Sequence, residues 1–146
     1  DISYNRSQES IIIGNNNKLM GAIFIGHDID IENDTTIYPG AMIAGYVDVK
    51  TGASIGLSAV INQKIVIGQY SMIASNSTII KHVFPYYINI NNVIHRLNTR
   101  KLPAYININD DIVLRKIYNS DCVDKENLNK YIKEDIDIYY NSLNAK

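Results

Sequence analysis

Hydrophobic positions in the first half of the chain recur every six residues. A helix repeats near 3.6 residues and an amphipathic strand repeats at 2, so neither of them produces this period. A chain that turns a corner every six residues, and points one aliphatic side chain inward each time, does produce it. The hexads therefore predict a β-solenoid, and the aliphatic stripe is its core rather than a cofactor site. The twelve stripe residues are Ile13, Leu19, Ile25, Ile31, Ile37, Ile43, Val49, Ile55, Ile61, Ile67, Ile73 and Ile79.

The remaining hexad positions agree with this interpretation. The residue after a stripe position is often Gly or Ala, as at Gly26 and Ala44, where a tight corner leaves little room for a side chain. Three hexads make one triangular coil of about 18 residues, so the pattern predicts about four coils. We expect the solenoid to occupy residues 1–84, with repeats from about residue 13, and residues 85–146 to form a connecting segment and a C-terminal helical extension.

The second half of the chain follows a different pattern. Pro85 is expected to end the hexad register, and the Tyr- and Asn-rich residues 85–108 show no clear period, which suggests packing along the last coil. A short helix is expected near residues 110–118, and a second helix is expected to begin at an N-cap, Asp124. One apolar face of the second helix is expected to dock on the solenoid or on a neighbouring subunit. That face comprises Leu128, Tyr131, Ile132, Ile136, Tyr139 and Leu143.

Composition narrows the possible functions. The 14 basic and 15 acidic residues are dispersed and give a net charge of −1, which argues against nucleic-acid binding and against a polybasic membrane anchor. No apolar run approaches the roughly 18 residues of a membrane span. The single cysteine, Cys122, has no intrachain partner, which favours a reducing, cytoplasmic compartment. Because residues 11–13 would leave open strand edges, we expect further coils to precede Asp1.

Four segments of the chain resemble sequences of a known protein family: NNKLMGAIFIGHDIDI, AGYVDV, INQKIVIG and HVFPYYI. Aligned without a gap over residues 17–88, they resemble the hexapeptide-repeat acyltransferases. Within these, the likeness is to the UDP-N-acetylglucosamine O-acyltransferases of lipid A synthesis and to nucleotide-sugar acetyltransferases of surface polysaccharide synthesis. The resemblance implies a left-handed parallel β-helix, an exception to the right-handed crossover rule, and a homotrimer with active sites between subunits. It also implies acyl or acetyl transfer from a coenzyme A or acyl-carrier-protein thioester to a hydroxyl or amine of a nucleotide-activated sugar.

The resemblance assigns catalytic roles to three residues. His27 matches the general base that removes a proton from the attacking sugar group, and Asp28 matches the acidic neighbour that orients its imidazole. Gly45 follows His27 by three hexads, which is one full coil, so Gly45 should lie directly beside His27. It matches the residue whose backbone N–H stabilises the tetrahedral oxyanion. These three residues are the predicted catalytic set.

A second set is expected to contact substrate. Gln63 and Lys81 continue the column of His27 and Gly45 at intervals of one coil, and Gln63 matches a functional glutamine of the lipid A enzymes. The expected sugar-nucleotide or acyl-arm contacts are Tyr46, Asn62, Gln63, Lys81 and Asn98. The resemblance implies no metal and no tightly bound cofactor. The acyl-CoA or acyl carrier protein enters as a co-substrate.

Two other functions are known for solenoids of this kind: a scaffold and a metal-dependent enzyme. Phe24, Tyr46 and Asn62 stand where the lipid A enzymes have histidines, which keeps open a non-catalytic solenoid that serves as a scaffold or assembly module. A zinc-dependent carbonic anhydrase on the same fold needs three converging histidines. Three coils separate His27 from His82, and His95 lies beyond the repeats, so that alternative is rejected.

Overall fold

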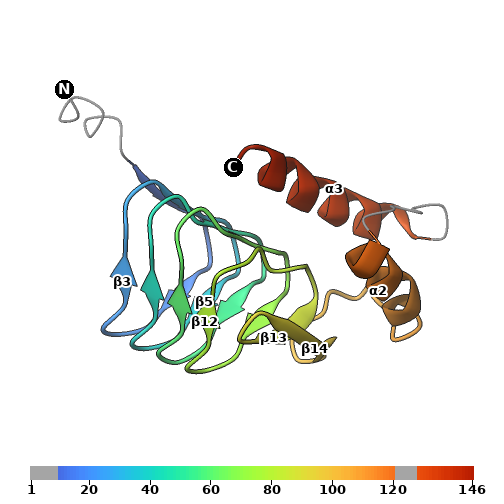
Figure 1. Ribbon diagram of the computed structural model, residues 1–146, viewed down its shortest axis with the longest axis horizontal. Coiled ribbons are helices and arrows are strands. Elements are labelled where there is room, and N and C mark those ends of the chain that lie inside the picture. The colour runs from blue at the N-terminus through green and yellow to red at the C-terminus, as the bar shows by residue number, and fades with distance from the viewer. Residues whose placement is uncertain (1–9, 121–127) are drawn as a thin grey trace.

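The computed structural model describes residues 10–120 and 128–146, and it contains the predicted solenoid as a left-handed parallel β-helix of about four coils (Figure 1). Its short strands line three faces of a triangular prism. The first face comprises β1 (Ile11–Ile13), β4 (Ile29–Ile31), β7 (Asp48–Val49) and β10 (Val66–Ile67). The second comprises β2 (Lys18–Leu19), β5 (Thr36–Ile37), β8 (Ser54–Ile55), β11 (Met72–Ile73), β13 (Tyr87–Ile90) and β14 (Val93–Leu97). The third comprises β3 (Phe24–Ile25), β6 (Met42–Ile43), β9 (Val60–Ile61) and β12 (Thr78–Ile79).

The aliphatic stripe forms the core of the prism. From Ile13 to Ile61, each stripe residue pairs in parallel with the stripe residue one coil further on, as in Ile25 with Ile43 and Ile43 with Ile61. From Ile31 to Ile79 every stripe residue is fully buried, and each such side chain contributes roughly 1.5–3 kcal/mol of hydrophobic stabilisation. Ile13 and Leu19 remain exposed because no coil of the described chain covers that end of the solenoid.

The last coil is shorter than the others. Val83 pairs with Ile67, and Ile88 pairs with Met72, so the partners in both pairs lie closer in sequence than the regular coil spacing. Since Ile79 still pairs with Ile61 in the regular register, the shortening falls between Ile79 and Val83. The register therefore slips before Pro85, where the sequence pattern placed its end.

A β-hairpin closes the end of the solenoid. β13 and β14 pair antiparallel through a turn at Asn91 and Asn92, both of which have positive φ. Their side-chain oxygens accept hydrogen bonds from the backbone of β12 and the residue after it: Asn91 Oδ1 from Thr78 N at 2.9 Å, and Asn92 Oδ1 from Ile80 N at 2.7 Å. The hairpin thus caps the open edge of the third face, which an exposed sheet edge requires.

Two helices follow, α2 (Asp110–Ser120) and α3 (Lys130–Asn144). The helix expected near residues 110–118 is confirmed. The predicted N-cap Asp124 lies outside the described residues, and α3 begins later than expected, at Lys130. Asn129 caps it, because its side-chain oxygen accepts hydrogen bonds from Tyr131 N and Ile132 N at 3.0 Å each.

Helix α3 docks on the solenoid, as its apolar face predicted. Ile132, Ile136 and Tyr139 are buried in a second core with Val66 of the first face. From the segment that follows the repeats, this core includes Phe84, Tyr86, Tyr87, Leu97 and Ile106. Tyr131 is 49% exposed, so that part of the predicted face is wrong, and Leu128 is buried but precedes the helix. Neither described helix is both long and apolar enough to cross a membrane.

One carboxylate joins α3 to the end of the solenoid. Asp135 Oδ2 accepts hydrogen bonds from Tyr86 Oη at 2.5 Å and from Tyr105 Oη. Burial raises the pKa of Asp135 above 3.8, and the two tyrosine hydrogen bonds only partly oppose this effect. Burial also raises the pKa of Tyr86 and of Tyr105, so both phenols stay protonated donors.

The raised pKa predicts how pH affects α3 docking. The folded protein holds the Asp135 proton more tightly than the unfolded chain does, so this proton stabilises the fold at low pH. That contribution is lost as pH rises above 3.8 and through the higher folded pKa. The Asp135→Asn variant keeps an oxygen acceptor and does not titrate. The measured quantity is the free energy of unfolding of wild type minus that of the variant, obtained from urea titrations. We expect this difference to decrease as the pH is raised from about 4 to 7. A difference that rises over this range would mean that the tyrosine hydrogen bonds outweigh burial.

Candidate functional site

His27 and Asp28 form a hydrogen-bonded pair at the corner between the third and first faces. His27 Nδ1 and Asp28 Oδ2 are 2.9 Å apart, and the imidazole is about half exposed. A carboxylate only accepts hydrogen bonds, so Nδ1 carries the proton in this contact and Nε2 keeps its lone pair in the neutral ring. The pair therefore presents a nitrogen that can accept a proton at the surface.

Gly45 lies beside the imidazole on the next coil. A Cβ atom at this position would lie 2.8 Å from His27 Nε2 and 2.9 Å from Cε1, so only glycine allows this approach. Among the described residues the Gly45 N–H donates no hydrogen bond, while its carbonyl accepts one from Lys64 N at 3.1 Å. The site thus combines a proton acceptor with a nearby backbone donor that has no partner in the described part of the chain.

The residues predicted to contact substrate near His27 lie on the same coil corner or on the corners of the following coils. Gln63 and Asn62 are exposed on the next coil, and the Gln63 N–H donates to Asn62 Oδ1 at 3.0 Å. Tyr46 packs edge-on against the His27 ring, with centroids 5.0 Å apart. Lys81 belongs to the shortened corner of the last coil, between Ile79 and Val83, and its N–H donates to Asn92 Oδ1 at 3.3 Å.

An apolar pocket of about 320 Å³ borders this corner on the third face. Phe24 and Met42 are 59% and 49% exposed, and with Val60 and Ile80 they make an outer surface that is unusually apolar for a solvent-facing sheet. The pocket reaches the site through Ala44 and Asn62, which immediately precede Gly45 and Gln63. The sequence analysis did not identify this surface. Its signal was the apolar residue before the stripe position in three successive coils, at Phe24, Met42 and Val60.

Asn98 lies elsewhere, in a cavity of about 470 Å³ on the second face. Its side chain is 4% exposed, and Nδ2 donates to the Tyr70 carbonyl at 3.0 Å. The residue therefore holds the segment after β14 against the solenoid as well as lining the cavity. Within one chain it is not brought together with His27, since Asn98 follows a strand of the second face and His27 lies where the third and first faces meet.

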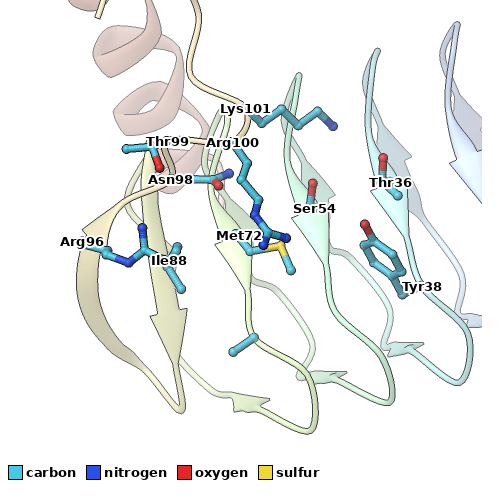
Figure 2. A pocket seen from close by; sticks show the side chains of 11 residues that line it. Thr36, Tyr38, Ser54, Met72, Ile88, Arg96, Asn98, Thr99, Arg100 and Lys101 are labelled. Carbon is cyan, nitrogen blue, oxygen red and sulfur yellow. The ribbon is translucent and has the colours of Figure 1, made fainter. Parts of the chain in front are cut away.

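Basic side chains surround the cavity of Asn98. Figure 2 shows Arg100 extending over Met72, Lys101 reaching along the rim above Ser54, and Arg96 beside Ile88. Lys101 Nζ donates to the Asp34 carbonyl at 2.5 Å, and burial lowers the pKa of Lys101. The sequence analysis singled out only Asn98 here. The available signal was the clustering of three basic residues in the short segment 96–101.

The electrostatic character of the two regions differs. The His27 corner offers a base beside an apolar pocket, and the second-face cavity offers cations that suit an anionic ligand such as a phosphate. No group of three His, Cys, Asp or Glu side chains in the described part of the chain could hold a metal ion.

Comparison with known proteins bears on the repeats. No family model matches the chain. The chain is 33% identical over 76 residues to an acyl-[acyl-carrier-protein]–UDP-N-acetylglucosamine O-acyltransferase of Nautilia profundicola, which is 52% of this chain and 29% of that protein. It is 34% identical over 74 residues to the protein of the same name from Alkalilimnicola ehrlichii, which is 51% of this chain and 29% of that protein. The matched segment spans less than a third of these relatives' length.

Solved structures support the fold. A UDP-N-acetylglucosamine acyltransferase from Francisella novicida matches 92% of this chain and 49% of its own, with a TM-score of 0.65 and 22% identity. A UDP-N-acetylglucosamine acyltransferase from Campylobacter jejuni matches 92% of this chain and 65% of its own, with a TM-score of 0.60 and 19% identity. The resemblance to the hexapeptide-repeat acyltransferases is confirmed.

Proposed function

We propose that this chain, which resembles the hexapeptide-repeat acyltransferases in sequence and fold, is itself an acyltransferase. It would move an acyl or acetyl group from a coenzyme A or acyl-carrier-protein thioester to a hydroxyl or amine of a nucleotide-activated sugar. The product would enter lipid A or surface polysaccharide synthesis in the cytoplasm. The observation that carries the proposal is the His27 imidazole, held by Asp28 through Nδ1 and closely approached by Gly45.

The chemistry of the site supports this reaction. His27 Nε2 accepts the proton of the sugar hydroxyl or amine as that group attacks the thioester carbonyl carbon. The carbonyl oxygen becomes an oxyanion, which accepts a hydrogen bond from the Gly45 N–H. When the tetrahedral intermediate collapses, the C–S bond breaks and the imidazolium returns its proton to the departing thiolate. The products are the acylated sugar and the free thiol, and Asp28 stabilises the imidazolium throughout.

Substrate binding is assigned to the two regions described above. The apolar third-face pocket suits the acyl chain, because it opens beside His27 and is lined by Phe24, Met42 and Val60. The basic second-face cavity, with Asn98 and Arg100, suits the diphosphate of a nucleotide sugar. Asn62, Gln63 and Lys81 are proposed to contact the sugar or the acyl arm at the His27 end.

A second copy of the chain is needed to unite these regions. One chain places His27 at the corner between the third and first faces and the basic cavity on the second face. In the proposed homotrimer of parallel prisms, the basic cavity of one copy would face the His27 corner of the next and so close each site between two subunits. We therefore propose that the working form is a homotrimer.

The test is a screen for thiol release. Acetyl-CoA, longer acyl-CoAs and acyl carrier proteins with stepped chain lengths are combined with UDP-, dTDP- and GDP-linked sugars, and the acylated product is identified by mass spectrometry. We expect turnover with a defined donor and acceptor. Sedimentation, run alongside, is expected to give three subunits. A folded trimer that turns over no pair would favour the non-catalytic scaffold instead.

A further inference from the structure

The backbone at Tyr46 is unfavourable for a tyrosine. Its φ is 61°, in the left-handed region, and the equivalent corner residues of the neighbouring coils are Asp28 at 53° and Lys64 at 60°. Glycine, asparagine and aspartate tolerate this region best, whereas a bulky aromatic residue is strained there. A tyrosine at this position therefore needs a reason other than its backbone preference.

The side chain of Tyr46 also contributes little to the core. It is 44% exposed, and it belongs to neither of the two buried clusters that stabilise the solenoid and the helices. Its ring contact is with the His27 imidazole, at a centroid distance of 5.0 Å and an interplanar angle of 87°. This edge-to-face arrangement is the favoured geometry of aromatic pairs. The contact thus joins the strained residue to the proposed catalytic base.

The His27 imidazole is half exposed, so few neighbouring atoms hold it in one orientation. Asp28 holds it at Nδ1, and Gly45 lies next to Nε2 and Cε1, but one hydrogen bond alone leaves an exposed side chain free to rotate into solvent. The Tyr46 ring stands beside the imidazole and restricts that rotation.

We propose that Tyr46 is a positioning residue for His27. Its ring confines the imidazole to the rotamer in which Nδ1–H donates to Asp28 and Nε2 stays next to Gly45. This inference rests on the proposed function for its catalytic consequence, but the confinement itself can be observed without any substrate. It gives Tyr46 a different role from the substrate contact that the sequence suggested.

The test compares three variants. Tyr46→Asn removes the ring and relieves the backbone, and Tyr46→Phe keeps the ring. Lys64→Asn relieves the same backbone conformation one coil away, where it keeps the backbone N–H that donates to the Gly45 carbonyl and changes no side chain of the proposed site. We expect Tyr46→Asn and Lys64→Asn both to raise the Tm. Only Tyr46→Asn should lower kcat, by roughly 5- to 50-fold with little change in KM, and Tyr46→Phe should restore most of the loss.

A spectroscopic measurement makes the result independent of activity. In ¹⁵N-histidine NMR of the neutral imidazole, wild-type His27 is expected to show the Nδ1–H tautomer. Tyr46→Asn is expected to show a mixture of tautomers, and Lys64→Asn the wild-type spectrum. An unchanged tautomer in Tyr46→Asn, or a raised KM with unchanged kcat, would overturn the positioning role. A shifted tautomer in a protein that turns over no substrate would sustain this inference and overturn the proposed function.

Discussion

Replacing His27 by alanine is expected to lower kcat/KM for acyl transfer by about 10²- to 10⁴-fold, the usual contribution of a positioned general base. The imidazole is about half exposed and lies outside both buried clusters, so its loss should leave the Tm nearly unchanged. The activity that remains would come from substrate binding and from the Gly45 N–H, since a thioester is already activated.

His95 provides the matched control for this variant. It lies exposed on β14, and its backbone carbonyl, rather than its side chain, accepts a hydrogen bond from Arg115. His95→Ala is therefore expected to keep wild-type activity in the same steady-state assay. Near-normal turnover by His27→Ala would remove the general base from the mechanism. It would point instead to an amine acceptor that enters the site already neutral.

Replacing Gly45 by alanine should also damage the site, through a collision rather than a lost group. The new Cβ would lie 2.8 Å from His27 Nε2, closer than real Cβ contacts allow, so the imidazole must move away. We expect kcat to fall by roughly 10- to 10²-fold, because displacements near 1 Å disturb a reacting geometry to this extent. The φ of Gly45 is not positive, so alanine introduces no backbone strain and the Tm should change little.

Gly21→Ala is the control for added volume, because a Cβ there meets nothing within 4 Å. A double variant isolates the collision. In the His27→Ala background the imidazole is gone, so Gly45→Ala should cause little further loss of the residual activity. Full activity in Gly45→Ala alone would show that the His27 position found here is not the reactive one.

The repeat was readable from the sequence because one local rule applies to every coil. The strand of each hexad buries one aliphatic side chain, so the stripe from Ile31 to Ile79 reports the core directly. The same periodicity places Gly45 one coil from His27, and the structure has the two residues side by side. Local patterning of this kind also located α2 (Asp110–Ser120).

The features that the sequence analysis missed depend on long-range contacts. The shortened corner between Ile79 and Val83 precedes Pro85, the first position at which the hexad pattern fails, so the pattern placed the end of the register too late. The hairpin of β13 and β14 had a local signal, two asparagines between short apolar runs, which favours a turn with positive φ. No such signal predicted that the hairpin would bind the edge of β12. The hydrogen bonds concerned join the side chains of Asn91 and Asn92 to backbone N–H groups that lie much earlier in the sequence.

Asn98 and the start of α3 illustrate a second limit. Whether Asn98 points into a cavity depends on how the segment after β14 crosses the solenoid, which the Tyr70 carbonyl helps to fix. Asp124 and Asn129 are both acceptable N-caps by type. Residue type alone does not choose between them, and the structure gives the capping hydrogen bonds of α3 to Asn129.

The most direct test of acyl transfer at a site shared between copies is complementation in mixed trimers. One variant carries His27→Ala and the other Arg100→Ala, which weakens the basic cavity. The two are co-expressed, or unfolded together and refolded, and thiol release is compared with that of each variant alone. If each site takes His27 from one copy and the cavity from the next, random assortment restores about a quarter of the wild-type sites. Activity in the mixture that stays at the average of the two separate variants would contradict a site between subunits.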